Sequence, residues 1–239
     1  MVDNFSFFVT AMVLALTMPV GTPYIVVVVS AFFSIFIVKM TFGGLGRNYF
    51  NPGLAGRCFA GMICPAIASE LCKVTIAGEE YVSLASGGTN TIYNLILGQG
   101  VGGIGTTCVL IIVVCLVFLT YTRIVDAKIP LISILSYFVV GLLLCGLNQT
   151  VLNLFSGSFL FISVFMLTDP NTSPDTTIGK IIYSCAFGAL SAVVWNMGIL
   201  GENSLFAVAL FVNLLVPYID RVMIWRPINL GGYRNAYKN

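Results

Sequence analysis

The sequence predicts an all-α, polytopic membrane helix bundle of about eight spans, built as an inverted repeat with broken helices. Its composition, its apolar stretches and a repeated motif predict this fold. Of 239 residues, 58% are hydrophobic, only 8% are charged and none is His. A soluble domain carries about 25% charged residues. We therefore expect residues 1–239 to form a single integral membrane domain, and a nucleic-acid-binding role is excluded.

Eight apolar stretches are candidate spans of a hydrocarbon layer about 30 Å thick, which a straight helix crosses in about 20 residues. They are 5–18, 24–42, 54–72, 107–121, 129–147, 151–167, 178–197 and 204–219. Several are shorter than that length, so other helices or a protein-lined cavity must cover their backbone ends. We therefore expect buried, broken helix ends at Pro19, Pro23, Pro65, Pro170 and Pro174.

Positive charges are concentrated on one side of these spans. With eight spans both termini share a side, and that side carries Lys39, Arg47, Arg123, Lys128, Arg221, Arg226, Arg234 and Lys238. The opposite side carries Lys73, Glu79, Glu80 and Glu202. Cytoplasmic loops are enriched in Lys and Arg. Both termini are therefore predicted to be cytoplasmic, and the loop 73–106 is predicted to be extracytoplasmic.

Two motifs occur twice in the same order. Residues 16–23 match 167–174 as L-T-x-P-x-x-x-P, and residues 43–48 match 198–203 as G-x-L-G-x-N. An odd number of predicted spans separates the paired elements, so the two copies should lie in opposite orientations. Such repeats commonly enclose a site near the middle of the membrane. A duplication without a preserved site is the alternative.

The repeat divides the chain into four regions. They are an incomplete first repeat at 5–72, an external loop at 73–106, a second repeat at 107–221 and a cytoplasmic tail at 222–239. The second repeat opens with a hairpin that has no counterpart before Phe5. A five-plus-five arrangement lacking its first two spans explains this difference.

Polar residues gather near both breaks and are candidates for an ion path. They are Asn51 and Arg57 near the first break, and Asp169, Asn171 and Thr172 near the second. A charge at the centre of the bilayer costs at least ~3 kcal/mol, so such groups usually face a cavity or a partner. We expect Asn51, Arg57 and Asp169 to flank a cavity. Alternatively, Arg57 and Asp169 only cap broken helices or pair with backbone groups.

No catalytic residue and no metal site is predicted. Without His, imidazole general bases and His-ligated metals are excluded. The seven cysteines form no C-x-x-C pair. We expect them to pack as small apolar side chains.

The external loop contains S-G-G-T at 86–89 and a glycine-rich run at 98–105. Glycines let backbone N–H groups converge on a phosphate, and a hydroxyl can carry a phosphoester. On these residues alone, a flexible external turn is the alternative.

Four longer motifs carry a resemblance to a known family. They are F-G-G-L-G-R-N-Y-F-N-P (42–52), L-x-L-G-x-G-V-G-G-I-G-T-T (95–107), T-D-P-N-T-S-P (168–174) and N-L-L-V-P-Y-I-D-R (213–221). From about Phe5 to Arg221 the chain resembles the D subunit of Rnf complexes (RnfD) and the homologous B subunit of the sodium-pumping NADH:quinone reductase (NqrB). Members of that family have ten spans. The lack of a long N-terminal extension favours the D type.

The resemblance implies a membrane subunit of a redox-driven ion translocase, which is not an enzyme by itself. The complex would pass electrons between ferredoxin and NAD while moving sodium ions or protons. Its partners would be the other subunits of an Rnf-type complex, in the inner (plasma) membrane of a bacterial or archaeal cell. Two alternatives stay open: a non-redox channel or carrier of the inverted-repeat type, and a flavin-free assembly scaffold.

The resemblance also implies flavin. In that family an FMN is attached through its phosphate to the Thr of an S-G-A-T-like motif, and a second flavin such as riboflavin binds without a covalent link. Here Gly88 stands where Ala is usual. The expected flavin-binding residues are Thr89, as the covalent acceptor, with Ser86, Gly87, Gly100, Gly102 and Gly103.

Overall fold

The structure, a computed structural model, describes residues 6–41, 50–69, 75–76, 79–80, 89–98, 102–198 and 201–227. The first half holds α1 (Ser6–Leu16), α2 (Tyr24–Phe32), its π-helical continuation η1 (Phe33–Met40), α3 (Pro52–Ile63), α4 (Ala66–Ser69), β1 (Thr75–Ile76), β2 (Glu79–Glu80) and α5 (Thr89–Ile96). The second half holds α6 (Val109–Tyr121), α7 (Lys128–Phe155), α8 (Phe159–Phe161), its π-helical continuation η2 (Ile162–Met166), α9 (Thr177–Asn196) and α10 (Asn203–Pro227). The predicted all-α membrane bundle is confirmed, with one small addition: β1 and β2 pair antiparallel.

The surface and interior of the bundle suit a lipid environment. Three helices within the described residues are long and apolar enough to cross a membrane unaided: Lys128–Phe155, Thr177–Asn196 and Asn203–Met223. Large apolar side chains face outward, among them Phe118 at 61% and Leu143 at 81% exposure. Small polar side chains such as Ser133 are fully buried. Because lipid solvates apolar groups, this distribution is typical of membrane bundles.

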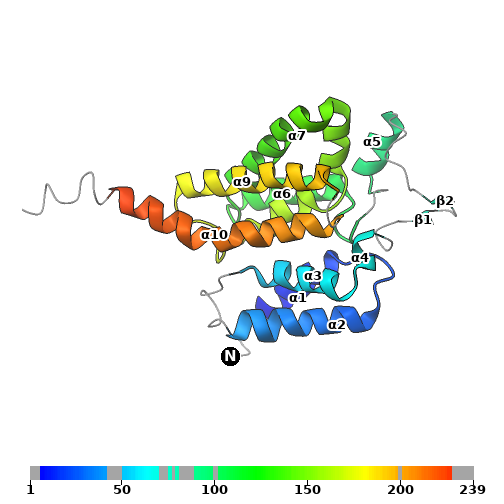
Figure 1. Ribbon diagram of the computed structural model, residues 1–239, viewed down its shortest axis with the longest axis horizontal. Coiled ribbons are helices and arrows are strands. Elements are labelled where there is room, and N and C mark those ends of the chain that lie inside the picture. The colour runs from blue at the N-terminus through cyan, green and yellow to red at the C-terminus, as the bar shows by residue number, and fades with distance from the viewer. Residues whose placement is uncertain are drawn as a thin grey trace, which may run out of the picture.

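The helices cross the bundle in alternating directions. At one end, called here the Asp169 end, η1 finishes against the start of α1, and α3 begins beside Asp169. At the opposite end, called the Glu202 end, α1 finishes against the segment entering α6, where Gly105 N–H donates to the Leu16 carbonyl at 2.7 Å. In Figure 1, α10 starts at the right, near α5 and the β1–β2 hairpin, and ends at the left.

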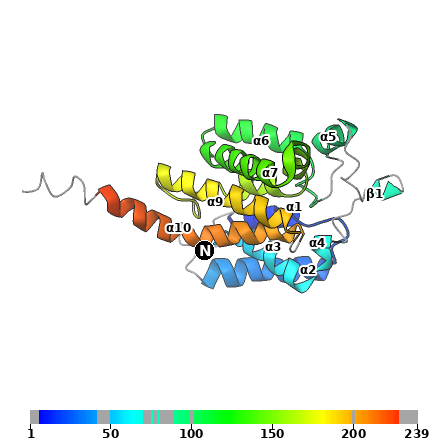
Figure 2. The same ribbon diagram turned by 45° about the horizontal axis from the view of Figure 1, so that its top comes forward.

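The second half continues the alternation. The ion pair between Lys180 and Asp126 places the start of α9 beside the α6–α7 connection. The hydrogen bond from Ser158 to Glu202 places the start of α8 beside the start of α10. Among the described residues, successive helices therefore run alternately toward the Asp169 end and the Glu202 end. Both views show α2 and α3 on one side of α10 and α7 and α9 on the other (Figures 1 and 2).

The two L-T-x-P motifs lie at opposite ends of the bundle, as an inverted repeat requires. In each copy the threonine hydroxyl donates back to a carbonyl of the preceding turn: Thr17 to Leu14 at 2.7 Å, and Thr168 to Val164 at 2.5 Å. These side-chain bonds to backbone carbonyls compete with the regular helix pattern and favour a helix end. The repeated threonine therefore ends a helix in both halves.

Helix boundaries differ from the predicted spans at several places. The predicted span 54–72 ends early, since α3 stops at Ile63 and Pro65 separates it from α4. The predicted break after residue 147 lies instead at Gly146, whose φ of 77° turns the chain inside α7. The Thr150 hydroxyl donates to the Gly146 carbonyl at 2.6 Å and fixes this turn. A second turn at Gly157, with a φ of 73°, precedes α8.

Close packing of α7 against α9 depends on a glycine. A Cβ on Gly188 would overlap the Ser133 carbonyl oxygen and lie 2.8 Å from the Tyr137 backbone nitrogen. The rings of Phe159 and Phe187 stack beside this contact with centroids 5.2 Å apart. Small residues let membrane helices approach closely, and this approach provides much of their association energy.

We expect Gly188→Ala to lower stability by about 1–3 kcal/mol, because the added methyl group meets backbone atoms that cannot rotate away. The measurement is the thermal unfolding midpoint of the purified protein in detergent. Cys185→Ala, on an exposed position of the same helix, is the control. Equal midpoints for the two variants would contradict this packing.

Candidate functional site

A half-open cavity of about 460 Å³ lies at the Asp169 end. Its apolar wall comes from α1, α6 and η2 and includes Val13, Leu119 and Phe165. Polar side chains converge on it from α1, η1, the start of α3 and the turn after η2; they are Thr10, Lys39, Asn51, Thr168, Asp169 and Asn171. Ligand sites commonly combine an apolar wall with a few convergent polar groups.

Asn51 links the two repeats at this cavity. Its Oδ1 accepts from the backbone N–H of Gly53 at 2.9 Å and of Leu54 at 3.4 Å, which caps α3. Its Nδ2 donates to the Met166 carbonyl at 3.0 Å and lies 3.4 Å from Asp169 Oδ2. Pro52 occupies the first turn of α3, where a missing N–H costs nothing. Asn51 and Pro52, the last two residues of the motif at 42–52, therefore set the start of α3.

Asp169 is the carboxylate of this cavity. Burial raises its pKa, while a hydrogen bond from the Asn171 backbone N–H at 3.1 Å and the positive charge of Lys39 lower it. Lys39 is only 8% exposed, and its Nζ donates to Thr10 Oγ1 at 3.1 Å. The charge pattern of the sequence assigns Lys39 only to the cytoplasmic side. Its burial beside a carboxylate makes it a member of the site.

Arg57 does not line this cavity. It lies six residues into α3 from Asn51, about 9 Å along the helix axis at 1.5 Å per residue. Its Nε donates to the Thr17 carbonyl at 3.1 Å and its Nη1 to Asn203 Oδ1 at 2.5 Å. Its guanidinium also lies 4.7 Å from the centre of the Phe206 ring. Arg57 therefore joins α1, α3 and α10, as the capping alternative anticipates.

Glu202 is a buried acidic residue that sequence reasoning misses. The charge pattern places it on the outer side, but it is only 5% exposed and accepts a hydrogen bond from Ser158. A Cβ on Gly102 would lie 3.3 Å from Glu202 Oε1, and one on Gly157 would lie 3.8 Å from it. The carboxylate thus lies between two glycines. No sequence signal beyond the G-x-L-G-x-N motif points to its burial.

The glycine run packs against the chain itself. A Cβ on Gly103 would lie 2.6 Å from the Thr17 carbonyl oxygen, and Gly103 forms a β-bridge with Pro19. The Gly103 N–H donates to Thr106 Oγ1 at 2.8 Å. Gly103 therefore lets the segment before α6 contact the turn after α1, whereas Gly102 packs against Thr106 and Glu202. Their predicted contact with flavin stays a prediction.

The other residues predicted to bind flavin or to line an ion path lie partly inside and partly outside the described residues. Thr89 is the first residue of α5, whereas Ser86, Gly87, Gly100 and the side chain of Thr89 lie outside the described part of the chain. Asn171 is exposed and lines the cavity. Thr172 is 4% exposed, and its hydroxyl has no hydrogen-bond partner among the described residues.

Comparison with known proteins identifies the family. Residues 1–229 match the profile described as the NQR2, RnfD, RnfE family. The chain belongs to this family. Its motif positions can therefore be compared directly with other NQR2, RnfD, RnfE proteins, and the predicted family is confirmed.

Two relatives belong to complexes named for ferredoxin and NAD. The chain is 30% identical to the D subunit of the Na(+)-translocating ferredoxin:NAD(+) oxidoreductase complex of Acetobacterium woodii, over 92% of this chain and 71% of the relative. It is 28% identical to the D subunit of the proton-translocating ferredoxin:NAD(+) oxidoreductase complex of Clostridium ljungdahlii, over 96% and 75%.

A third relative represents the other branch of the NQR2, RnfD, RnfE family. The chain is 29% identical to the B subunit of the Na(+)-translocating NADH-quinone reductase of Pseudomonas paraeruginosa, over 98% of this chain. It covers only 63% of that relative.

The membrane-spanning character of the chain is supported both by its long apolar helices and by its family.

Proposed function

We propose that this chain is the D subunit of an Rnf-type complex, which passes electrons between ferredoxin and NAD while sodium ions or protons cross the membrane. The family match over residues 1–229 supports this proposal. So do the names of the A. woodii and C. ljungdahlii relatives, which share the redox reaction and differ in the ion. The other subunits of the complex are its proposed partners.

The cavity at the Asp169 end is the observation that carries a redox function. An isoalloxazine ring has two apolar faces and a polar edge of carbonyl oxygens and ring nitrogens. A cavity of about 460 Å³ with Leu119 and Phe165 on its wall and Asn51 and Lys39 among its polar lining suits such a ring. Ligand cavities typically measure about 300–1,000 Å³. We assign this cavity to the flavin that binds without a covalent link.

The residues around the cavity have distinct proposed roles. Lys39 would orient the polar edge of the flavin, and Phe165 would exclude water from the face of the ring. Asn51 would position the Met166 carbonyl and Asp169 at the cavity through its own hydrogen bonds. Flavins supply one- and two-electron transfer when bound. Asp169 would hold the transported cation near this site, because buried carboxylates in membrane proteins commonly mark ion paths. Only the second repeat offers this group, since Met18 occupies the matching position of the first.

Thr89 is the proposed acceptor of a covalent FMN. The residue begins α5, an eight-residue helix. Helix N-termini favour phosphate groups because their backbone N–H groups lack intrahelical partners. Figure 1 places α5 at the end of the bundle where α10 starts. The covalent and non-covalent flavins would therefore lie at opposite ends of the bundle.

Flavin analysis of the purified full-length chain tests this proposal. The protein is denatured, and the flavin that stays on the chain is separated from the flavin that is released. We expect both fractions to contain flavin, with an intact mass raised by one FMN minus water. A chain without either flavin that transports solute by itself would instead establish the non-redox carrier.

A further inference from the structure

A second cavity, of about 550 Å³, lies beside the first at the Asp169 end. It is formed by the end of α6, the α6–α7 connection, the turn after η2 and the start of α9. Its polar lining is Thr120, Arg123, Asp126, Lys128, Thr168, Ser173 and Lys180. Its three cationic residues, Arg123, Lys128 and Lys180, lie outside the four motifs that resemble the family.

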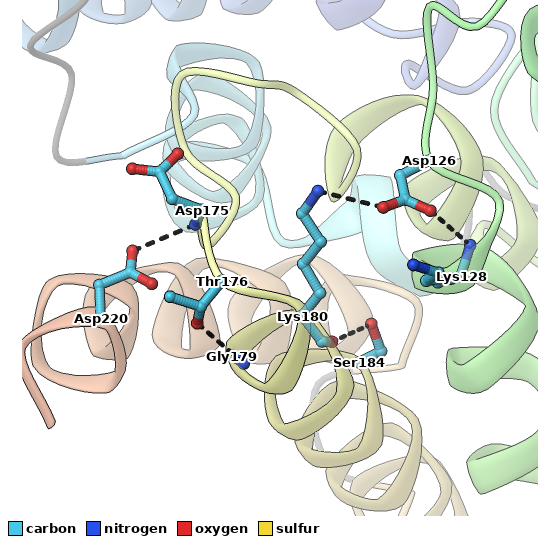
Figure 3. Close-up of polar contacts among 8 residues, drawn as sticks. All are labelled: Asp126, Lys128, Asp175, Thr176, Gly179, Lys180, Ser184 and Asp220. Atoms are coloured by element: carbon cyan, nitrogen blue, oxygen red, sulfur yellow. Dashed lines mark hydrogen bonds and ion pairs between the residues drawn. The ribbon is translucent and has the colours of Figure 1, made fainter. Parts of the chain in front are cut away.

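This cavity carries a surplus of positive charge. Lys180 Nζ lies 3.1 Å from Asp126 Oδ2, and the Lys128 backbone N–H donates to Asp126 Oδ1 at 3.2 Å (Figure 3). Burial alone would raise the pKa of Asp126, but these two hydrogen bonds and the charges of Lys180 and Lys128 lower it below its usual value. Asp126 is thus ionised at neutral pH. With Arg123, three cations face one carboxylate, which leaves two positive charges for a ligand.

Arg123 adopts a backbone conformation that favours glycine. Its φ is 57°, the only positive value among the described non-glycine residues. The Ile124 N–H donates to the Leu119 carbonyl at 3.0 Å and closes the end of α6 around it. An L-residue pays about 1–2 kcal/mol for this conformation, whereas glycine pays almost nothing. Arg123 thus occupies the turn that ends α6 and lines the cavity from there.

Two further observations indicate a ligand with both a charged and an apolar part. The Thr120 hydroxyl is buried in the cavity wall without a hydrogen-bond partner among the described residues. Apolar side chains around the cavity face outward: Ile124 is 65% exposed and Leu131, one turn after Lys128, is 57% exposed. The charged cavity is thus continuous with the surface that faces lipid.

We propose that this basic cavity binds the phosphate headgroup of an anionic phospholipid. Arg123 and Lys128 contact the phosphate, Lys180 contributes its charge while paired with Asp126, and the acyl chains follow Ile124 and Leu131. A free phosphate shares the charge but has no use for the exposed apolar rim. The site is separate from the redox function proposed above and does not depend on it.

Native mass spectrometry of the full-length chain in detergent tests this site. The probes are dioleoylphosphatidylglycerol, dioleoylphosphatidylcholine and inorganic phosphate. We expect phosphatidylglycerol to be retained at least tenfold better than phosphatidylcholine, and excess inorganic phosphate not to displace it. Each cation near a membrane surface contributes about 1 kcal/mol to binding an anionic lipid. Arg123→Gly and Lys128→Gln should therefore each weaken phosphatidylglycerol retention about fivefold.

The variants are chosen to keep the fold intact. Arg123→Gly suits the positive φ, so it removes the guanidinium without adding strain. Arg221→Gln is the matched control, because Arg221 is an exposed cation on α10 that does not line the cavity. Equal retention of the two lipids, or an equal loss in the Arg221 variant, would overturn the proposal. Displacement of the lipid by inorganic phosphate would also overturn it and would identify a free-phosphate site.

Discussion

Replacing Thr89 by alanine is expected to remove the covalently bound flavin completely. The proposed bond joins the threonine oxygen to the FMN phosphate, and alanine has no oxygen to form it. The measurement is flavin fluorescence of the denatured chain on a gel under ultraviolet light. The wild-type band should be yellow-green, and the Thr89→Ala band should show less than a hundredth of that signal.

Two controls separate loss of the acceptor from damage to the fold. Thr91→Ala removes a neighbouring hydroxyl of α5 and should keep the fluorescence. Thr89→Ser restores an oxygen at the same position and should recover part of it. A Thr89→Ala chain that stays fluorescent would show that another residue carries the flavin. A colourless wild-type chain whose removal still disrupts the complex would establish the assembly scaffold.

Changing Asn51 is expected to release the non-covalent flavin. Its Oδ1 caps α3 and its Nδ2 donates to the Met166 carbonyl at the cavity. Asn51→Asp keeps the capping oxygen but loses the N–H donor and places a second carboxylate beside Asp169. Asn51→Ala loses both functions. We expect each variant to bind the released flavin about five- to thirtyfold more weakly, since the lost bond to the Met166 carbonyl, which positions the cavity wall, is worth about 1–2 kcal/mol.

Both Asn51 variants should lower stability, for different reasons. Losing the N-cap costs about 1 kcal/mol, so the thermal midpoint should fall for Asn51→Ala. Asn51→Asp keeps the cap, but its midpoint should also fall because it loses the bond to the Met166 carbonyl and repels Asp169. Asn196→Ala is the control: Asn196 lies at the last turn of α9, away from the cavity, and bonds only to its own helix at Ala192. Unchanged content of released flavin in both Asn51 variants would disprove the assignment of the cavity.

The alternating passes are predictable from the sequence because apolar length and proline position are local signals. The L-T-x-P repeat correctly places broken helix ends at residues 17–19 and 168–170. It cannot predict that Gly146 turns α7, because a single glycine within an apolar run carries no sign of its φ. Pro65 correctly marks the break between α3 and α4, although the predicted span runs on to residue 72.

The site is predictable only in part. Asn51 and Asp169 lie within the motifs 42–52 and 168–174, at the start of α3 and just after η2, and both line the cavity at the Asp169 end. Arg57 is six residues from Asn51, and its partners Thr17 and Asn203 come from the two ends of the chain. Lys39 is an ordinary interfacial lysine by sequence, and only the packing of η1 against α1 buries it. Such long-range contacts leave no local pattern.

The central claim is that electron transfer drives ion movement through this subunit. Inverted membrane vesicles holding the whole complex should take up sodium ions or protons only while reduced ferredoxin is oxidised by NAD, and the rate of uptake should follow the rate of oxidation. Vesicles with the Thr89→Ala chain should show neither process. Ion uptake that continues without ferredoxin, or that survives Thr89→Ala unchanged, would contradict the account.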